Sequence, residues 1–439
     1  MERYRFNYRS FSDLEQDIVK LGLDLPLESD LSVLQEAVSV GDGQIPNRLA
    51  IQPMEGCDSL PDGSPSELTE RRYIRYAQGG CGLIWFEAVA VSNKGRGKPS
   101  QLHIHESTLN AFTQLVDKTR NVAMETNGIN PYLVLQLTHA GRYGNNKIIV
   151  VHEEELDRKA KVDPDKAIVT DEELLEFEDD MVKAALLAKQ AGFDAVDIKS
   201  CHRYLISENL GAHTRSGQFG GSYQNRTRLV KNIIRKIKDQ QIDIEVTVRL
   251  NSYDAVNYPY GWGTDVQGHI DLTEPKQLVA ELHNLGLSMI NITASTPYLA
   301  PHLSRPYDQP TKRGYPAPEH PLIGVNRMIH LARELQEVVP DMVIVGTGYS
   351  WLRHYAPQVA AGVAKAGWAK VLGFGRQAFA YPDFANDIIN QGEMVGKKVC
   401  VSCSKCSELK AAARLTGCVV RDNQVYVPPY VQLIKEMNV

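Results

Sequence analysis

Short apolar segments rich in β-branched residues recur along the chain and are separated by longer segments with helical periodicity. The apolar segments are residues 48–54, 82–91, 132–139, 195–200, 244–250, 288–294, 342–348 and 370–376. The amphipathic segments between them include residues 109–124, 172–191, 222–238, 275–285 and 325–338. Apolar strands that alternate with helices predict parallel βαβ units. Because eight such units recur, we expect an α/β fold, a closed (β/α)8 TIM barrel.

A doubly wound open sheet is the alternative fold for this pattern. That fold favours a Gly-rich turn directly after an early strand. The first apolar segment runs instead into Gln52-Pro53-Met54-Glu55-Gly56, which lacks the G-x-G-x-x-G spacing. The sequence therefore favours the closed barrel.

The segments outside the barrel pattern suggest three parts. We expect residues 1–44 to form a helical lead-in that ends in a turn at Asp42-Gly43. Residues 45–392 would form the barrel, and residues 393–439 would form a cysteine-rich C-terminal segment.

Composition narrows the classes of function. The chain has 439 residues with a net charge of −5, and no basic stretch is interleaved with aromatic residues, which argues against nucleic acid as a partner. Residues 1–31 are polar and charged without an apolar signal core, and no apolar run is long enough to cross a bilayer. Seven unevenly placed cysteines do not resemble a secreted disulfide framework. We therefore expect a cytoplasmic protein.

Single polar residues interrupt several apolar segments near their C-terminal ends. Glu87, Gln136, Lys199 and Arg249 are the examples. A polar group inside a strand core is costly unless it finds a partner. These residues could pair with each other, for instance Arg249 with Glu87, or they could bind a polar ligand. Four such residues at the same end of the strands favour the ligand.

Four cysteines near the C-terminus have the spacing of a metal site. Cys400, Cys403 and Cys406 are each separated by two residues, and Cys418 follows. Three thiolates on one tight loop with a fourth from farther on can enclose an iron–sulfur cluster or a tetrahedral metal. Zinc sites more often show two well-separated Cys-x-x-Cys pairs, so iron–sulfur is the favoured interpretation and zinc the alternative.

One stretch of the chain resembles the old yellow enzyme family of FMN-dependent ene-reductases. Members carry His-x-x-His-Gly-Tyr-Leu at a strand end, followed by Gly-Gly-Ser-x-x-Asn-Arg. This chain has Lys199-Ser200-Cys201-His202-Arg203-Tyr204-Leu205 and then Gly220 to Arg226, reading GGSYQNR. Residues 136–142, reading QLTHAGR, match a second family pattern. Lys199 therefore replaces the first histidine of the family.

The resemblance implies an FMN site at the carboxyl ends of the strands. Contacts with the flavin ring fall to Pro53, Met54, Glu55, Glu87, Ala88, Gln136 and Arg249. The phosphate contacts fall to Gly346, Thr347, Gly348, Gly375 and Arg376. Glycines let backbone amides approach an anion, arginine binds phosphate bidentately, and the loops after strands seven and eight often form phosphate sites in barrels.

The resemblance also implies the reaction. The family reduces an activated C=C bond with hydride from reduced FMN, and Tyr204 matches the tyrosine that donates the proton. His202 and Lys199 would bind the substrate or the flavin edge, and Tyr298 and His302 are further candidates for the barrel mouth. The alternatives are an amine dehydrogenase or demethylase on the same barrel and a flavin-binding barrel without catalysis.

Two barrel enzymes related to the family, 2,4-dienoyl-CoA reductase and trimethylamine dehydrogenase, carry a similar four-cysteine run that holds a 4Fe-4S cluster. The resemblance therefore implies such a cluster here. Those enzymes continue into nucleotide-binding domains, whereas this sequence ends at Val439. We expect either NAD(P)H or an electron-donor protein as the reductant, a small unsaturated molecule as the substrate, and a homo-oligomer.

Overall fold

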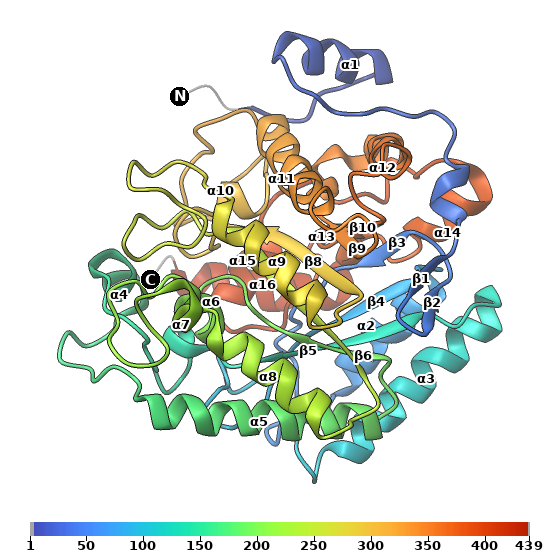
Figure 1. Ribbon diagram of the computed structural model, residues 1–439. Coiled ribbons are helices and arrows are strands. Elements are labelled where there is room, and N and C mark those ends of the chain that lie inside the picture. Colours follow the sequence, from blue (N-terminus) through green and yellow to red (C-terminus); the bar gives the residue numbers. More distant parts are fainter. Residues whose placement is uncertain (1–3, 438–439) are drawn as a thin grey trace.

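The computed structural model describes residues 4–437 and shows a closed barrel of eight parallel strands (Figure 1). The strands are β3 (Leu49–Ile51), β4 (Leu83–Ala90), β5 (Tyr132–Thr138), β6 (Ala195–Ile198), β7 (Glu245–Tyr253), β8 (Met289–Ala294), β9 (Val343–Gly346) and β10 (Val371–Phe374). Each strand falls on one of the eight predicted apolar segments. Pairing of β10 with β3 closes the ring, so the prediction of a TIM barrel is confirmed and the open sheet is wrong.

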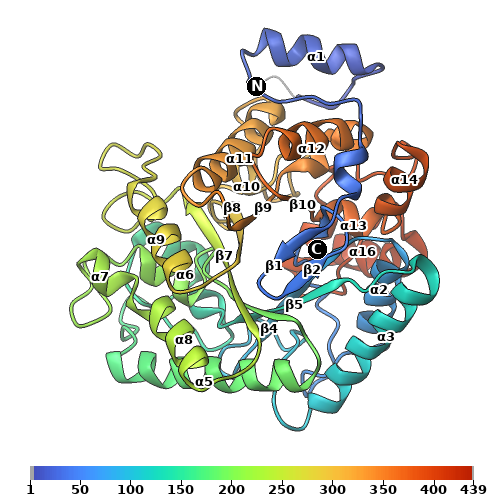
Figure 2. The same cartoon turned by 45° about the vertical axis from the view of Figure 1, so that its right-hand side comes forward.

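Helices surround the barrel, as Figure 2 shows. The longer ones are α2 (Glu67–Gln78), α3 (Leu109–Asn127), α5 (Asp171–Gln190), α8 (Arg228–Asp239), α9 (Thr273–Asn284), α11 (Pro321–Gln336), α12 (Ala356–Lys365) and α14 (Phe384–Gln391). Shorter helices are η2 (Gly141–Tyr143), α4 (Glu154–Ala160), α6 (Leu205–Leu210), α7 (Tyr223–Arg226), α10 (Pro301–Ser304), η3 (Tyr349–Tyr355) and α13 (Arg376–Ala380). The helix predicted over residues 222–238 is divided at Thr227, whose hydroxyl donates to Tyr223 O at 2.8 Å.

The N-terminal segment contains strands as well as the predicted helix. It comprises α1 (Phe11–Lys20), η1 (Ser32–Gln35), β1 (Val38–Val40) and β2 (Gly43–Ile45). The two strands form an antiparallel hairpin across the turn at Gly41, which has a φ of 53°. Val38, Val40 and Ile45 join the apolar cluster of the barrel interior that includes Trp85, so the hairpin covers one end of the barrel (Figure 2). The segment thus contains a helix, as predicted, and the chain turns near Asp42-Gly43 within the hairpin that follows it.

The C-terminal segment packs on the loop that follows β3. It contains α15 (Lys405–Ala411) and α16 (Asn423–Met437). Thr416 N donates to Gly56 O at 2.7 Å, and Asp422 accepts from Arg71 at 2.8 Å and from Arg75 at 2.5 Å. Among the residues described, no helix is both long and apolar enough to span a bilayer.

A buried arginine joins α2 to the barrel. Arg72 Nη1 lies 2.5 Å from Asp58 Oδ2, and Arg72 Nη2 lies 2.5 Å from Glu87 Oε1. All three side chains are almost fully buried, at 4 % or less exposed. Two buried carboxylates thus depend on one guanidinium for their charge balance.

We expect Arg72→Met to lower the free energy of unfolding by about 3–5 kcal/mol, because it leaves two buried carboxylates without a counter-charge. Lys118→Met is the matched control, because the Lys118–Glu70 pair is exposed and should contribute about 1 kcal/mol or less. Urea unfolding of the two variants measures the difference. Equal losses for both would show that the buried network does not stabilise the barrel.

Candidate active site

A buried aspartate holds four neighbouring strands together at the barrel mouth. Asp197 on β6 accepts from Trp85 Nε1 at 2.8 Å, from Gln136 Nε2 at 2.6 Å and from the backbone N of Arg249 at 2.5 Å. Burial raises the pKa of Asp197 to about 6 against the effect of these bonds. Gln136 on β5 and Arg249 on β7 are therefore joined through the same carboxylate, one by its side chain and the other by its backbone.

The carboxylate of Glu87 binds Arg72 and the backbone of Gly56, away from Asp197 and its partners. The β4–β5 register shifts between Trp85 and Ala88, which interrupts the alternation of side chains along β4. Glu87 binds Arg72, and it accepts from Gly56 N at 2.8 Å. The pairing with Arg249 considered from the sequence is therefore wrong. Ala88, the other predicted flavin contact on β4, lies opposite Gln136.

Two arginines, Arg249 and Arg376, each have a buried N–H donor without an acceptor among the described residues. Arg249 is 7 % exposed, and its Nε has no acceptor within residues 4–437. Burial lowers the pKa of Arg249 despite the nearby charges of Cys201 and Asp197. Arg376 donates from Nη2 to Pro306 O at 2.6 Å, while its buried Nη1 has no partner among the described residues. Buried donors without acceptors are the kind of groups that an anionic ligand satisfies.

The predicted phosphate-binding glycines lie at the ends of β9 and β10. Gly348 has a φ of 110°, a conformation that favours glycine, and with Thr347 it is half-buried. A Cβ on Gly375 would lie 3.3 Å from Met54 Sδ, so the end of β10 contacts the segment after β3. Gly346 O accepts from the Gln52 amide at 3.2 Å. The structure therefore places the predicted ring-side and phosphate-side segments next to each other, with Pro53 half-buried beside Met54.

The predicted proton donor lies in a cluster of tyrosine, lysine and glutamate side chains. Tyr204 precedes α6, and its hydroxyl lies 3.5 Å from Glu55 Oε1 and 3.3 Å from the Tyr298 hydroxyl. Lys199 Nζ lies 3.7 Å from the centre of the Tyr204 ring and 3.8 Å from Glu55 Oε1. A second lysine, Lys410 on α15, approaches the same carboxylate oxygen to 3.1 Å. The structure thus brings Glu55, Lys199 and Tyr204 together.

Charge and burial shift the pKa values of this cluster in opposite directions. Burial alone would raise the pKa of Glu55, but the charges of Lys410, Lys199 and Lys98 hold it at about 2. Burial lowers the pKa of Lys199 to about 8, against the attraction of Glu55. Burial, with the charge of Glu55, raises the pKa of Tyr204 well above its ordinary value. At neutral pH the carboxylate is ionised and the tyrosine is protonated.

Two consecutive residues before Tyr204 adopt left-handed backbone conformations. His202 has a φ of 63° and Arg203 a φ of 59°. Arg203 stands where the quoted family pattern has glycine, and its Nη1 lies 3.0 Å from Asp254 Oδ2 in a fully buried pair. Burial, with the charges of Arg249 and Lys199, lowers the pKa of His202 well below its ordinary value, so its ring is neutral at neutral pH.

Of the two weaker candidates for the mouth, only Tyr298 joins the cluster. Its ring stacks on Tyr143 with the centroids 3.7 Å apart. His302 instead lies 3.0 Å from the Tyr315 hydroxyl. The sequence missed Asp197, which could have been recognised as an acid inside an apolar strand, and Lys410, for which no local pattern exists.

The four cysteines of the C-terminal segment are buried or half-buried. Burial raises the pKa of Cys406 to about 11 and that of Cys418 to about 12, and other cysteines of the segment, when ionised, add to both shifts. Cys400 Sγ accepts from Ser402 N, and Cys418 Sγ accepts from Arg421 N, each at 3.4 Å. Within residues 4–437, no three His, Cys, Asp or Glu side chains converge closely enough to hold a single metal ion.

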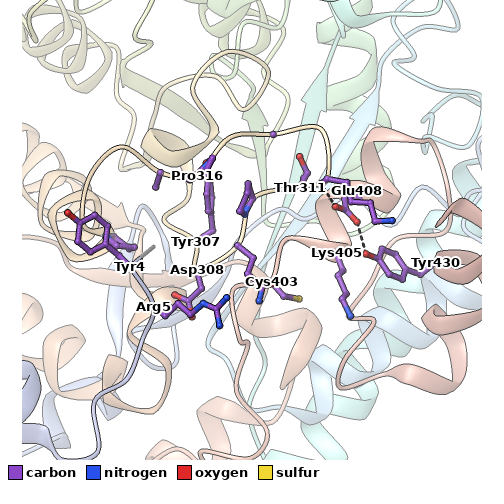
Figure 3. A pocket seen from close by; sticks show the side chains of 16 residues that line it. Tyr4, Arg5, Tyr307, Asp308, Thr311, Pro316, Cys403, Lys405, Glu408 and Tyr430 are labelled. Atoms are coloured by element: carbon purple, nitrogen blue, oxygen red, sulfur yellow. Dashed lines mark hydrogen bonds between the residues drawn. The ribbon is translucent and has the colours of Figure 1, made fainter. Parts of the chain in front are cut away.

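A cavity of about 520 Å³ lies beside this cysteine loop (Figure 3). Its lining includes Cys403 and Lys405 from the C-terminal segment, Tyr307 from the loop after α10, and Arg5 from the N-terminus. Figure 3 shows that the cavity lies between these three parts of the chain. None of the lining residues belongs to the cluster around Tyr204.

A closed parallel barrel with charged and polar side chains at the carboxyl ends of its strands defines the class of barrel enzymes. The sequence model of the NADH:flavin oxidoreductase / NADH oxidase family matches residues 34–354. The chain belongs to this family.

Two curated relatives and one solved structure illustrate the similarity. An NADH oxidase of Thermoanaerobacter brockii is 25 % identical over 83 % of this chain, and the match spans only 52 % of that protein. An NADPH dehydrogenase of Listeria monocytogenes is 27 % identical over 72 % of this chain and 90 % of its own length. A 2-naphthoyl-CoA reductase complex superposes with a TM-score of 0.70 and 18 % identity, over 89 % of this chain and 57 % of that one. The structural similarity shows the shared fold.

We expect the ammonium group of Lys199 to lose its proton near pH 8, so that the fraction charged falls between pH 7 and 9. Lysine ¹⁵N NMR follows the titration, and the resonance that disappears in Lys199→Met assigns it. A midpoint at about 10.4, the ordinary value for lysine, would show that burial does not act on this group.

Proposed function

We propose that this protein is an FMN-dependent oxidoreductase that reduces an activated C=C bond, with Tyr204 as the proton donor. The observation that carries the proposal is the position of the Tyr204 hydroxyl, next to Glu55 and Tyr298 at the barrel mouth. Membership of the flavin oxidoreductase family supports the cofactor, and the names of the relatives support NADH or NADPH as the reductant.

The residues of the mouth fit FMN. Arg249 Nε and Arg376 Nη1 are buried donors without acceptors among the described residues, and they suit the ring and the phosphate respectively. Gln136 uses its amide nitrogen on Asp197, which leaves Oε1 to accept from a ligand. The glycines at the ends of β9 and β10 would let backbone amides approach the phosphate. When bound, FMN supplies hydride to the double bond, and the fixed charge of Arg249 stabilises its reduced form.

Tyr204 is suited to hold and deliver a proton. Its raised pKa keeps the hydroxyl protonated at neutral pH, as a general acid requires. The Tyr298 hydroxyl lies 3.3 Å away and is placed to return a proton to Tyr204. The ammonium of Lys199 would bind the electron-withdrawing oxygen of a small unsaturated substrate, in place of the family histidine.

We expect Tyr204→Phe to slow oxidation of the reduced enzyme by an enone about 100-fold, the scale of general acid catalysis. Reduction by NADPH should keep its rate, because that step needs no proton from Tyr204. Stopped-flow absorbance of the flavin separates the two half-reactions. Tyr76→Phe is the control, since the Tyr76 hydroxyl is buried without a partner in the described chain. An unchanged oxidative rate would remove Tyr204 from the mechanism.

We further propose that the four cysteines hold a 4Fe-4S cluster. The donor set fits, because the C-terminal segment supplies four thiols and two of them accept backbone N–H bonds, as cluster ligands do. A single zinc with Zn–S bonds of about 2.3 Å is the alternative for the same four thiols. When bound, the cluster would carry single electrons from a donor protein.

We expect the anaerobically purified protein to contain about four irons per chain and to give a paramagnetic signal after reduction. Cys406→Ala should lose most of the iron. Cys81→Ala, which removes a thiol buried in the core away from the loop, should retain it. Metal analysis with electron paramagnetic resonance measures both. Stoichiometric zinc without iron would contradict the cluster and favour the alternative metal.

A further inference from the structure

The helix that starts in the cysteine loop carries a lysine to the barrel mouth. α15 spans Lys405–Ala411, and Lys410 lies four residues after Cys406, so the two side chains share one face of the helix. Lys410 lies beyond residues 34–354, the part of the chain that matches the family. The family match therefore gives this lysine no role.

Three groups converge on one oxygen, Glu55 Oε1. Lys410 Nζ lies at 3.1 Å, the Tyr204 hydroxyl at 3.5 Å and Lys199 Nζ at 3.8 Å. Coulomb attraction falls with distance, so the carboxylate is shared unequally between the two lysines. The Lys410 side chain, 35 % exposed, takes the ion pair, while that of Lys199, 4 % exposed, donates no hydrogen bond within the described residues.

Building on the proposed function, we propose that Lys410 is a positioning residue that holds the Glu55 carboxylate and leaves the N–H groups of Lys199 available to the electron-withdrawing oxygen of the substrate. The cysteine-rich segment then contributes to the proton-handling cluster directly. The segment would therefore have a role in the active site in addition to binding a metal.

The charged groups around Lys199 determine in which direction its pKa changes when Lys410 is replaced. Glu55, in the loop after β3, attracts its charge, as does Cys201 when ionised. Lys410 on α15 and Arg249 on β7 repel it. Removing the charge of Lys410 removes one repulsion and leaves Glu55 free to pair with Lys199. Both effects raise the pKa of Lys199.

The test is the titration of Lys199 in the full-length protein, followed by lysine ¹⁵N NMR. We expect Lys410→Met to raise the midpoint of Lys199 by about one pH unit or more, the scale of a newly available opposite charge. Lys410→Arg should keep the midpoint near the native value. The matched control is Arg414→Met, because the Arg414–Glu436 pair lies on the same segment and is about 40 % exposed on both sides.

A second variant should shift the Lys199 midpoint in the opposite direction. Glu55→Gln should lower the Lys199 midpoint, because the attraction is lost while the repulsion from Lys410 remains. Midpoints that move in the same direction in both variants, or that stay at the native value in Lys410→Met, would overturn the proposal. The titration needs no turnover, so its result stands apart from any failure to reduce a double bond, which would count against the proposed function instead.

Discussion

The mouth of the barrel depends on one carboxylate, Asp197. Because it accepts hydrogen bonds from β4, β5 and β7, it joins three strands to its own strand, β6. A buried acid is costly unless its lone pairs are used, and three donors use them here. The same bonds fix Gln136 through its side chain and Arg249 through its backbone. The side-chain amide of Gln136 is thus placed before any ligand binds, which lowers the cost of ordering it on binding.

The barrel does not complete its mouth alone. The C-terminal segment reaches the loop after β3 through the hydrogen bond from Thr416 N to Gly56 O, next to Glu55. Asp422 fixes the start of α16 to two arginines of α2. These contacts accompany the placement of Lys410 beside Glu55, which also lies near Lys199 and Tyr204. One turn of α15 separates Cys406 in the cysteine loop from Lys410 at the mouth.

The sequence predicted all eight barrel strands, because each is a short β-branched run whose pattern does not depend on distant contacts. It failed where distant contacts decide the structure. The β1–β2 hairpin is polar on its exposed side, and only the barrel interior explains why Val38 and Ile45 are apolar. The direction of Glu87 depends on a register shift in β4, which no local pattern reveals. Lys410 lies 355 positions from its partner Glu55 (410 minus 55), so only the folded chain brings the pair together.

Both departures from the quoted family motif add a cation at the end of β6, and each has an acid beside it. Lys199 replaces a histidine and lies near Glu55, while Arg203 replaces a glycine and pairs with Asp254. For a residue other than glycine, the left-handed backbone at Arg203 costs about 1–2 kcal/mol. The buried Arg203–Asp254 ion pair offsets this cost, and it does so only while both side chains are present. Removing Asp254 alone would leave a buried cation beside a strained backbone, directly before Tyr204. The loop from β7 that carries Asp254 is therefore part of what orients Tyr204, although Asp254 makes no hydrogen bond to it among the described residues.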